Sequence, residues 1–293
     1  MTSPAEITEH VIDVERVIAS KNPRLLKVLP GFLIQYLEKI LHQDEINDLI
    51  YRHRDVAGLD FVAAMLSEFG VKTETRVVSS AFQDEKKEPV PPASLSDFIS
   101  PLGKYIIASN HPLGGMDGMA LIHEVGKIRK DIVFPVNDIL MNVPGLKPLF
   151  IPINKHGKNN ENVEIIDHSF SSDKVILFFP AGLVSRKHKG GVIHDLEWKK
   201  TFITRARKYH RDVIPAYISG KNSSFFYNLS YYRTKLGIKA NLEMLYLVDE
   251  MIRQKGETLK ISFGEPIPWS HFNKSRTDVQ WANFVREKVY SLA

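Results

Sequence analysis

Short apolar runs that alternate with helix-forming segments limit the fold of this chain more than any other feature. Each run is five or six residues long, is bounded by turn residues, and is separated from the next by a segment with a helical period. Strands that alternate with helices typically form a largely parallel, buried sheet. We therefore expect an α/β fold with a largely parallel central sheet covered by helices. The expected strands are Tyr105–Ser109, Ile132–Val136, Val175–Phe179, Val213–Ile218 and Leu259–Phe263, and the expected helices are Met116–Arg129, Leu196–Tyr209, Asn241–Lys255 and Thr277–Leu292.

The N-terminal part of the chain has a different pattern. Apolar residues recur three to four positions apart from Ile7 to Phe69, a helical period that Pro30 interrupts. A short strand is expected at Thr73–Val78, and the charged, proline-rich stretch Asp84–Pro92 can continue no regular element. These patterns predict three parts: a helical N-terminal region over residues 1–83, a linker over 84–100, and an α/β domain with a C-terminal helix over 101–293.

Composition and charge narrow the class of protein. The content of 43% hydrophobic and 25% charged residues is typical of a soluble globular fold. The absence of Cys excludes disulfides, thiolate metal sites and a Cys nucleophile, and it favours the cytoplasm. A net charge of +5 without a recognition motif predicts no nucleic-acid partner. No apolar run reaches the ~18–20 residues of a spanning helix, so contact with a membrane is expected only at its surface.

One segment carries a pattern with chemical meaning. His111 follows the buried strand expected at 105–109, lies in a loop rich in Pro and Gly, and precedes Asp117 at the start of the next helix. Such a pair can act as a general base and the carboxylate that orients it. In the other interpretation His111 belongs to an ordinary turn, and Asp117 is a first-turn carboxylate that the helix dipole favours. The spacing of the two residues alone leaves both interpretations open.

The residues around this pair resemble a known motif. The sequence Asn-His-Pro at 110–112, two glycines, and Asp-Gly at 117–118 are similar to the His box of the glycerolipid (lysophospholipid) acyltransferase family. Five residues separate His from Asp, a spacing similar to that of a bacterial branch that includes ornithine-lipid and glycine-lipid O-acyltransferases and proteins labelled haemolysins. Three further blocks follow in the family's order, and the resemblance spans residues 102–268. These blocks are Asn137–Ile153, Phe179–Gly182 and Val213–Ala216.

The resemblance implies a reaction and its residues. The family transfers an acyl group directly from a thioester to a hydroxyl, so His111 would be the base and Asp117 its orienter. The co-substrate would be a thioester of acyl carrier protein or coenzyme A, and no cofactor or metal is expected. The lack of Cys and of a Gly-x-Ser-x-Gly elbow agrees with a reaction without a covalent acyl-enzyme. The residues expected to bind substrate are Asn110, Gly114, Gly115, Asn137, Pro180, Gly182, Ser185 and Arg186.

Two departures from the family pattern bear on the acceptor. Members that use glycerol phosphates normally carry Glu in the Phe-Pro-x-Gly block, where this chain has Ala181. In those members the second block commonly ends with an Arg that engages phosphate, whereas Ile151 to Lys155 contains none. We therefore expect a lyso-aminolipid acceptor, of the ornithine or glycine type. A 1-acylglycerol-3-phosphate acyltransferase of phospholipid synthesis remains an alternative.

The expected protein is thus a cytoplasmic O-acyltransferase, peripheral on the inner face of the cell membrane, that acylates the hydroxyl of a lysolipid. A second alternative is a non-catalytic lipid-binding protein of the same fold. A third, a metal hydrolase built from His111, Asp117 and His123, is disfavoured because residues six apart on a helix point to different faces.

Three other segments each allow two interpretations, and a fourth has one expected structure. Arg205–Arg211 is either a basic patch for lipid or acyl carrier protein or the charged end of a helix. Leu25–Leu41 is either an interfacial amphipathic helix or a cover for the sheet. Asp138–Phe150 lines an acyl-chain groove or is a packed connection. We expect Asn222–Tyr232 to form an aromatic, hydroxyl-rich loop.

Overall fold

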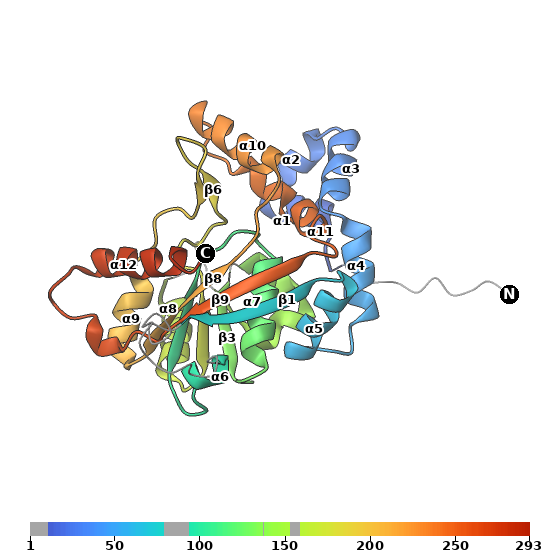
Figure 1. Cartoon of the computed structure of the whole chain (residues 1–293). Helices are drawn as coiled ribbons and strands as arrows, with labels where there is room; N and C mark the ends of the chain where they lie inside the picture. Colours follow the sequence, from blue (N-terminus) through green and yellow to red (C-terminus); the bar gives the residue numbers. More distant parts are fainter. Residues whose placement is uncertain (1–10, 79–93, 137, 153–158) are drawn as a thin grey trace.

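A seven-stranded sheet forms the centre of the computed structural model, which describes residues 11–78, 94–136, 138–152 and 159–293 (Figure 1). The strand order is β1-β9-β8-β2-β5-β3-β4, and every neighbouring pair is parallel except β8 with β9. The predicted α/β class with a largely parallel sheet is confirmed. The sheet strands are β1 Lys72–Val78, β2 Tyr105–Ser109, β3 Ile132–Val136, β4 Phe150–Pro152, β5 Val175–Phe178, β8 Asp212–Ile218 and β9 Thr258–Gly264, and the separate hairpin consists of β6 Arg186–Lys187 and β7 Ile193–His194.

Helices cover both faces of this sheet, as the alternation of side chains along its central strand β2 requires. Ile107 packs in the apolar cluster that includes residues of α5 and α7, whereas its neighbour Ile106 packs in the cluster that includes α9 and α12. The α-helices are α1 Val14–Lys21, α2 Pro23–Val28, α3 Gly31–Ile40, α4 Gln43–Arg52, α5 Leu59–Glu68, α6 Leu95–Phe98, α7 Met116–Gly126, α8 Asn159–Ser171, α9 Thr201–Tyr209, α10 Ser224–Lys235, α11 Leu247–Ile252 and α12 Asp278–Tyr290. The 3-10 helices are η2 Asp138–Asn142, η3 Pro144–Leu149, η4 Leu242–Tyr246 and η5 Trp269–His271.

The N-terminal region is helical, as predicted, and it is joined to the sheet. Pro30 separates α2 from α3, where it occupies the position before the first turn. The chain then enters the sheet as β1, which pairs in parallel with β9, with Lys72 opposite Thr258. The boundaries 1–83, 84–100 and 101–293 stay predictions, and Asp84–Pro92 lies outside the described residues.

All five strands expected beyond residue 100 are confirmed, with ends within one residue of their predicted positions. The expected loop over Asn222–Tyr232 is wrong, because most of it belongs to α10. The Ser223 hydroxyl accepts a hydrogen bond from the amide of Phe226 and so caps this helix. The buried side of α10 carries Phe226, Tyr227 and Ser230. The pattern of polar residues in this segment therefore reflects a helix cap and a partly buried helix.

The open segment Asp138–Phe150 is packed in part. Gly145, Leu146 and Leu149 of η3 are buried, which favours a packed connection there, whereas Leu140 of η2 is 41% exposed. In the part of the chain that the structure describes, no helix combines the length and the apolar character needed to cross a bilayer.

The parallel pairing brings three loops to one edge of the sheet. Strands β8, β2 and β5 are adjacent and parallel, so the segments that follow Ser109, Phe178 and Ile218 leave from the same carboxyl edge. In open α/β sheets this edge is where ligands bind. The fold therefore places the motif around His111 next to the Phe-Pro-Ala-Gly block.

Candidate active site

The side chains of His111 and Asp117 meet at the carboxyl edge of the sheet. His111 lies two residues beyond β2, and Asp117 is in the first turn of α7. The loop between them folds back so that Nδ1 of His111 lies 2.9 Å from Oδ2 of Asp117. The structure thus brings together the two residues that the sequence proposed as base and orienter.

The carboxylate of Asp117 is fully buried and held by backbone amides. Its Oδ2 accepts hydrogen bonds from the amides of Leu113 at 2.8 Å and Gly114 at 3.2 Å, and its Oδ1 accepts one from the amide of Gly118 at 2.8 Å. Gly114 can serve this loop because it has a φ of 102°, which side chains disfavour. An oxygen that already accepts from two amides carries no proton of its own, so Nδ1 of His111 donates.

Electrostatics keep this carboxylate ionised. Burial by itself raises the pKa of Asp117, but the positive charge of His111 and the hydrogen bonds from His111, Leu113 and Gly114 outweigh burial. The net effect holds the pKa of Asp117 below its ordinary value. At neutral pH the residue is therefore a fixed negative charge beside the imidazole.

Aromatic packing fixes the plane of the His111 ring. The ring stacks on Phe179 with a centroid distance of 4.1 Å and an interplanar angle of 18°. Phe179 in turn meets Phe134 edge-on at 5.0 Å. Among the described residues, Nε2 of His111 has no hydrogen-bond partner, and the side chain is 14% exposed. The arrangement therefore leaves one ring nitrogen available to a proton from outside.

A second buried carboxylate, which sequence reasoning missed, holds the backbone of His111. Oδ1 of Asp195 accepts from the amide of His111 at 3.1 Å and from the hydroxyl of Ser185 at 2.6 Å. The amide of Ser185 donates to the carbonyl of His111 at 2.7 Å. Nε1 of Trp198 donates to Oδ2 of Asp195 at 2.9 Å. No motif surrounds Asp195, so only the fold could reveal it.

Several residues predicted to bind substrate have contacts within the protein. The Asn110 amide group is buried and bonds both backbone groups of Ile218, at 2.9 Å and 2.7 Å. The Ser185 hydroxyl is directed to Asp195. Gly115 directly precedes α7, and a Cβ atom added to it would lie 3.0 Å from the sulfur of Met251. Asn137 lies outside the described residues. Substrate-binding roles for these residues stay predictions. The observed contacts of Asn110 and Ser185 hold the His111 loop in place.

The Phe-Pro-Ala-Gly block forms a tight turn beside His111. The amide of Gly182, which has a φ of 66°, donates to the carbonyl of Phe179, and the carbonyl of Pro180 accepts from the amide of Lys199. Ala181 is buried in an apolar cluster. The position that carries Glu in glycerol-phosphate-using members thus contributes only a methyl group.

Arg186 makes its contacts inside the protein. Its guanidinium lies 2.9 Å from the buried carboxylate of Glu243, donates to the carbonyl of Val184 at 2.5 Å, and sits over the ring of Phe226. Glu243 also pairs with Arg233 of α10. The binding role predicted for Arg186 stays a prediction, and its observed contacts join β6 to α10 and η4.

The cations at the end of α9 are engaged in ion pairs or buried. Arg205 and Lys208 pair with Asp167, at 2.7 Å and 2.9 Å, and Arg207 pairs with Asp278 at 2.8 Å. The guanidinium of Arg211 is buried and donates to backbone carbonyls. These contacts favour a structural helix end over a basic patch.

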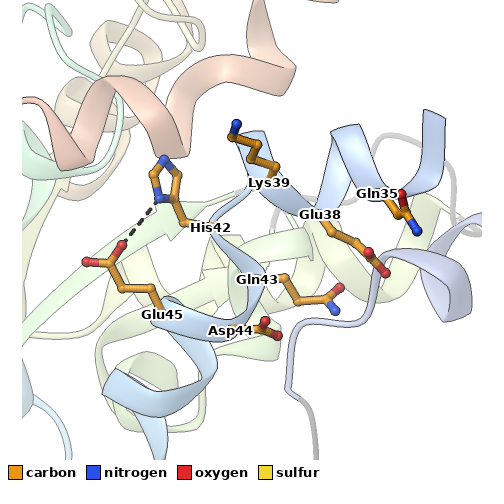
Figure 2. A pocket seen from close by; sticks show the side chains of 7 residues that line it. All are labelled: Gln35, Glu38, Lys39, His42, Gln43, Asp44 and Glu45. Carbon is orange, nitrogen blue, oxygen red and sulfur yellow. Dashed lines mark hydrogen bonds and ion pairs between the residues drawn. The ribbon is translucent and has the colours of Figure 1, made fainter. Parts of the chain in front are cut away.

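A pocket of 340 Å³ lies elsewhere, at the junction of α3 and α4 (Figure 2). Its lining is polar, and His42 in it contacts Glu45 at 3.2 Å and Asp249 of α11 at 3.1 Å. None of its lining residues belongs to the His111 loop. In the described part of the chain, no three His, Asp, Glu or Cys side chains, His123 included, form a metal-ligating group.

Comparison with known proteins identifies the family. A family model described as "Acyltransferase" matches residues 16–293. The chain belongs to this acyltransferase family. Membership makes the protein an acyltransferase, and it places the His111–Asp117 pair inside a matched region that covers nearly the whole chain.

Two curated members of the family are similar to this acyltransferase over nearly its full length. The lyso-glycine lipid O-acyltransferase of Bacteroides thetaiotaomicron is 42% identical and covers 96% of this chain and 97% of its own. The protein of the same name from Phocaeicola vulgatus is 41% identical, with 96% and 95% covered. The crystal structure of the 1-acyl-sn-glycerophosphate acyltransferase of Thermotoga maritima is 14% identical, covers 95% of this chain and 93% of that chain, and has a TM-score of 0.43.

Replacing Asp117 with Asn should lower the kcat of acyl transfer by roughly 10³–10⁴-fold, because the amide no longer fixes the tautomer of His111. Steady-state kinetics would measure this, with Asp131→Asn as a control that removes a carboxylate paired with Arg129 outside the loop. Thermal unfolding would show that both variants fold. A kcat within a few-fold of wild type for Asp117→Asn would refute the assignment.

Replacing Asp195 with Ala, which removes the acceptor of the His111 amide, should lower kcat by roughly 10–100-fold with little change in KM, because a displaced His111 backbone misplaces the imidazole. Trp198→Phe is the matched control, since it removes a donor to Oδ2 of Asp195 and leaves the His111 amide bond in place. Equal effects of the two variants on kcat would mean that Asp195 only stabilises the fold.

Proposed function

We propose that the protein transfers a fatty acyl group from a thioester to the hydroxyl of a lyso-glycine lipid, with His111 as the general base. The observation that carries the chemistry is the 2.9 Å contact between Nδ1 of His111 and the buried carboxylate of Asp117. The two relatives of 42% and 41% identity, both named lyso-glycine lipid O-acyltransferase, support this acceptor.

The proposed reaction begins at Nε2 of His111. This nitrogen takes the proton of the acceptor hydroxyl while the hydroxyl oxygen attacks the thioester carbonyl carbon. Asp117 accepts from Nδ1–H throughout and stabilises the imidazolium that forms. The tetrahedral intermediate then collapses, the carbon–sulfur bond breaks, and the leaving sulfur receives the proton from Nε2. The products are an ester and a free thiol, and the base is regenerated.

The protein donors considered for the oxyanion of this intermediate are engaged in other bonds. The amide of Gly114 donates to Asp117, the amide of Gly182 donates to Phe179, and the guanidinium of Arg186 contacts Glu243. Stabilisation by any of these groups would require their present bonds to be shared or exchanged. His111 and Asp117 therefore have defined roles in the reaction, and no oxyanion donor is assigned.

The absence of a carboxylate at Ala181 supports a non-phosphate acceptor. Ala181 is packed in the apolar cluster beneath the loop, so no acidic side chain there reaches an acceptor as Glu does in the resembled family. The donor is proposed to be a thioester of acyl carrier protein or coenzyme A, and no cofactor is proposed. The site of action is proposed to be the inner face of the cell membrane.

An acyl-transfer assay with purified protein should show incorporation of labelled acyl chains into lyso-glycine lipid in preference to lysophosphatidic acid. The expected reason is the apolar Ala181 in place of a carboxylate. Acyl-carrier-protein and coenzyme A thioesters would be offered in parallel. Preference for lysophosphatidic acid would favour the 1-acylglycerol-3-phosphate acyltransferase instead.

The His111→Ala variant should lose transfer by roughly 10³-fold or more, because the base that removes the hydroxyl proton is gone. His123→Ala is the matched control, since His123 lies on α7 outside the contacts of Asp117. Circular dichroism would establish that both variants are folded. Retained activity in His111→Ala would overturn the mechanism, and binding of lysolipid without transfer by wild type would favour the lipid-binding alternative.

A further inference from the structure

Exposed apolar side chains gather on two segments that are distant in the sequence. Val28 of α2 and Phe32 of α3 are 74% and 68% exposed, and Leu236, directly after α10, is 76% exposed. Isolated exposed apolar residues are common on soluble proteins, but a group of large ones marks an interaction surface. We define the docking face by its six most prominent side chains, which are Val28, Phe32, Tyr36, Phe225, Tyr232 and Leu236.

The two segments lie together in the fold. The hydroxyls of Tyr36 on α3 and Tyr246 on η4 are 2.6 Å apart, and the ring of Phe225 meets that of Tyr246 edge-on at 4.9 Å. Figure 1 shows α2 and α3 in blue next to α10 and α11 in orange, at one end of the molecule. The docking face therefore combines two segments that are distant in the sequence and meet at Tyr246.

Cations outnumber acids along the two segments that carry the docking face. The sequence contains no Asp or Glu between residues 22 and 37 or between residues 221 and 242. The exposed charged side chains on these stretches include Arg24 and Lys27 on one and Lys235 and Lys239 on the other. The next acid, Glu243, is buried against Arg186 and Arg233. Two acids lie nearby: Glu38 follows Tyr36 by two positions on α3, and Asp249 of α11 lies near Tyr246. A mainly basic, apolar surface fits an anionic bilayer, because its apolar side chains match the lipid interior and its cations match the headgroups.

The docking face is also connected to the candidate active site. Leu247 and Met251 follow η4 directly, and each packs on a glycine of the catalytic loop. A Cβ atom added to Gly114 would lie 3.0 Å from Leu247, and one added to Gly115 would lie 3.0 Å from the sulfur of Met251. Tyr246, which contacts Tyr36 and Phe225 of the docking face, is therefore followed directly by the helix that touches the His111 loop.

We propose that the docking face binds the surface of an anionic phospholipid bilayer and so brings the His111 loop to the lysolipid acceptor. This inference rests on the proposed function for the identity of the acceptor. Apolar side chains of both segments enter the interface, and the flanking Lys and Arg side chains contact lipid phosphates. Attachment of this kind needs no spanning helix.

The test compares wild type with the double variant Phe32→Asp/Leu236→Asp and the control Leu102→Asp. Leu102 is 92% exposed and precedes β2, at the edge of the sheet opposite the His111 loop. Binding to phosphatidylcholine vesicles with and without phosphatidylglycerol would be measured by co-sedimentation. We expect wild type and the control to bind the anionic vesicles and the double variant to bind them roughly tenfold or more weakly.

Two further measurements separate the possible outcomes. Acyl transfer in detergent micelles should be similar in all three proteins, and transfer to acceptor in vesicles should fall only in the double variant. Absent transfer in every protein, with the expected pattern of vesicle binding, would reject the proposed function and support the docking face. Unchanged vesicle binding by the double variant would overturn the docking face. Light scattering would measure the oligomeric state. A wild-type dimer that the substitutions break, with vesicle binding intact, would overturn the membrane proposal and make the docking face a contact between two copies of the chain.

Discussion

The buried hydrogen bond between Asp117 and His111 is the constraint on which the rest of the site depends. A carboxylate without exposure costs several kcal/mol to bury unless donors surround it, and here the donors are the amides of the loop that carries the His. The same bonds therefore close the loop, keep the carboxylate charged and set the imidazole tautomer. Asp195 repeats this arrangement on the backbone side, so that two buried acids hold His111 from two directions.

Much of the fold follows from patterns that are local in the sequence. Each central strand is buried on both faces, so its apolar run is continuous and its ends are marked by polar or turn residues. The His111–Asp117 pair was also within reach of sequence reasoning, because a strand, a short loop and a helix start leave few ways to place residues six positions apart. The sequence pattern predicts that His111 and Asp117 lie close together, and the structure adds the hydrogen bonds that hold them.

The features that were missed depend on contacts between distant residues. Asp195 meets His111 across 84 positions, and no spacing rule links them. Arg186 lies shortly after the Phe-Pro-Ala-Gly block, and its partner Glu243 lies in a 3-10 helix far along the chain. The hydroxyl-rich composition of Asn222–Tyr232 is typical of turns, whereas the Ser223 cap and the burial of Phe226 against other elements make most of this segment the helix α10.

The stacking of Phe179 on His111 has a consequence for competition with water. Thioesters are susceptible to hydrolysis, and a base that activates a lipid hydroxyl would activate a water molecule equally well. With one face of the imidazole covered by a phenyl ring, which is itself supported by Phe134, water cannot solvate the ring from that side. The lone pair of Nε2 lies in the plane of the ring, so it stays open to a hydroxyl that approaches the ring edge. The aromatic packing therefore limits the water around the base without covering the nitrogen that reacts.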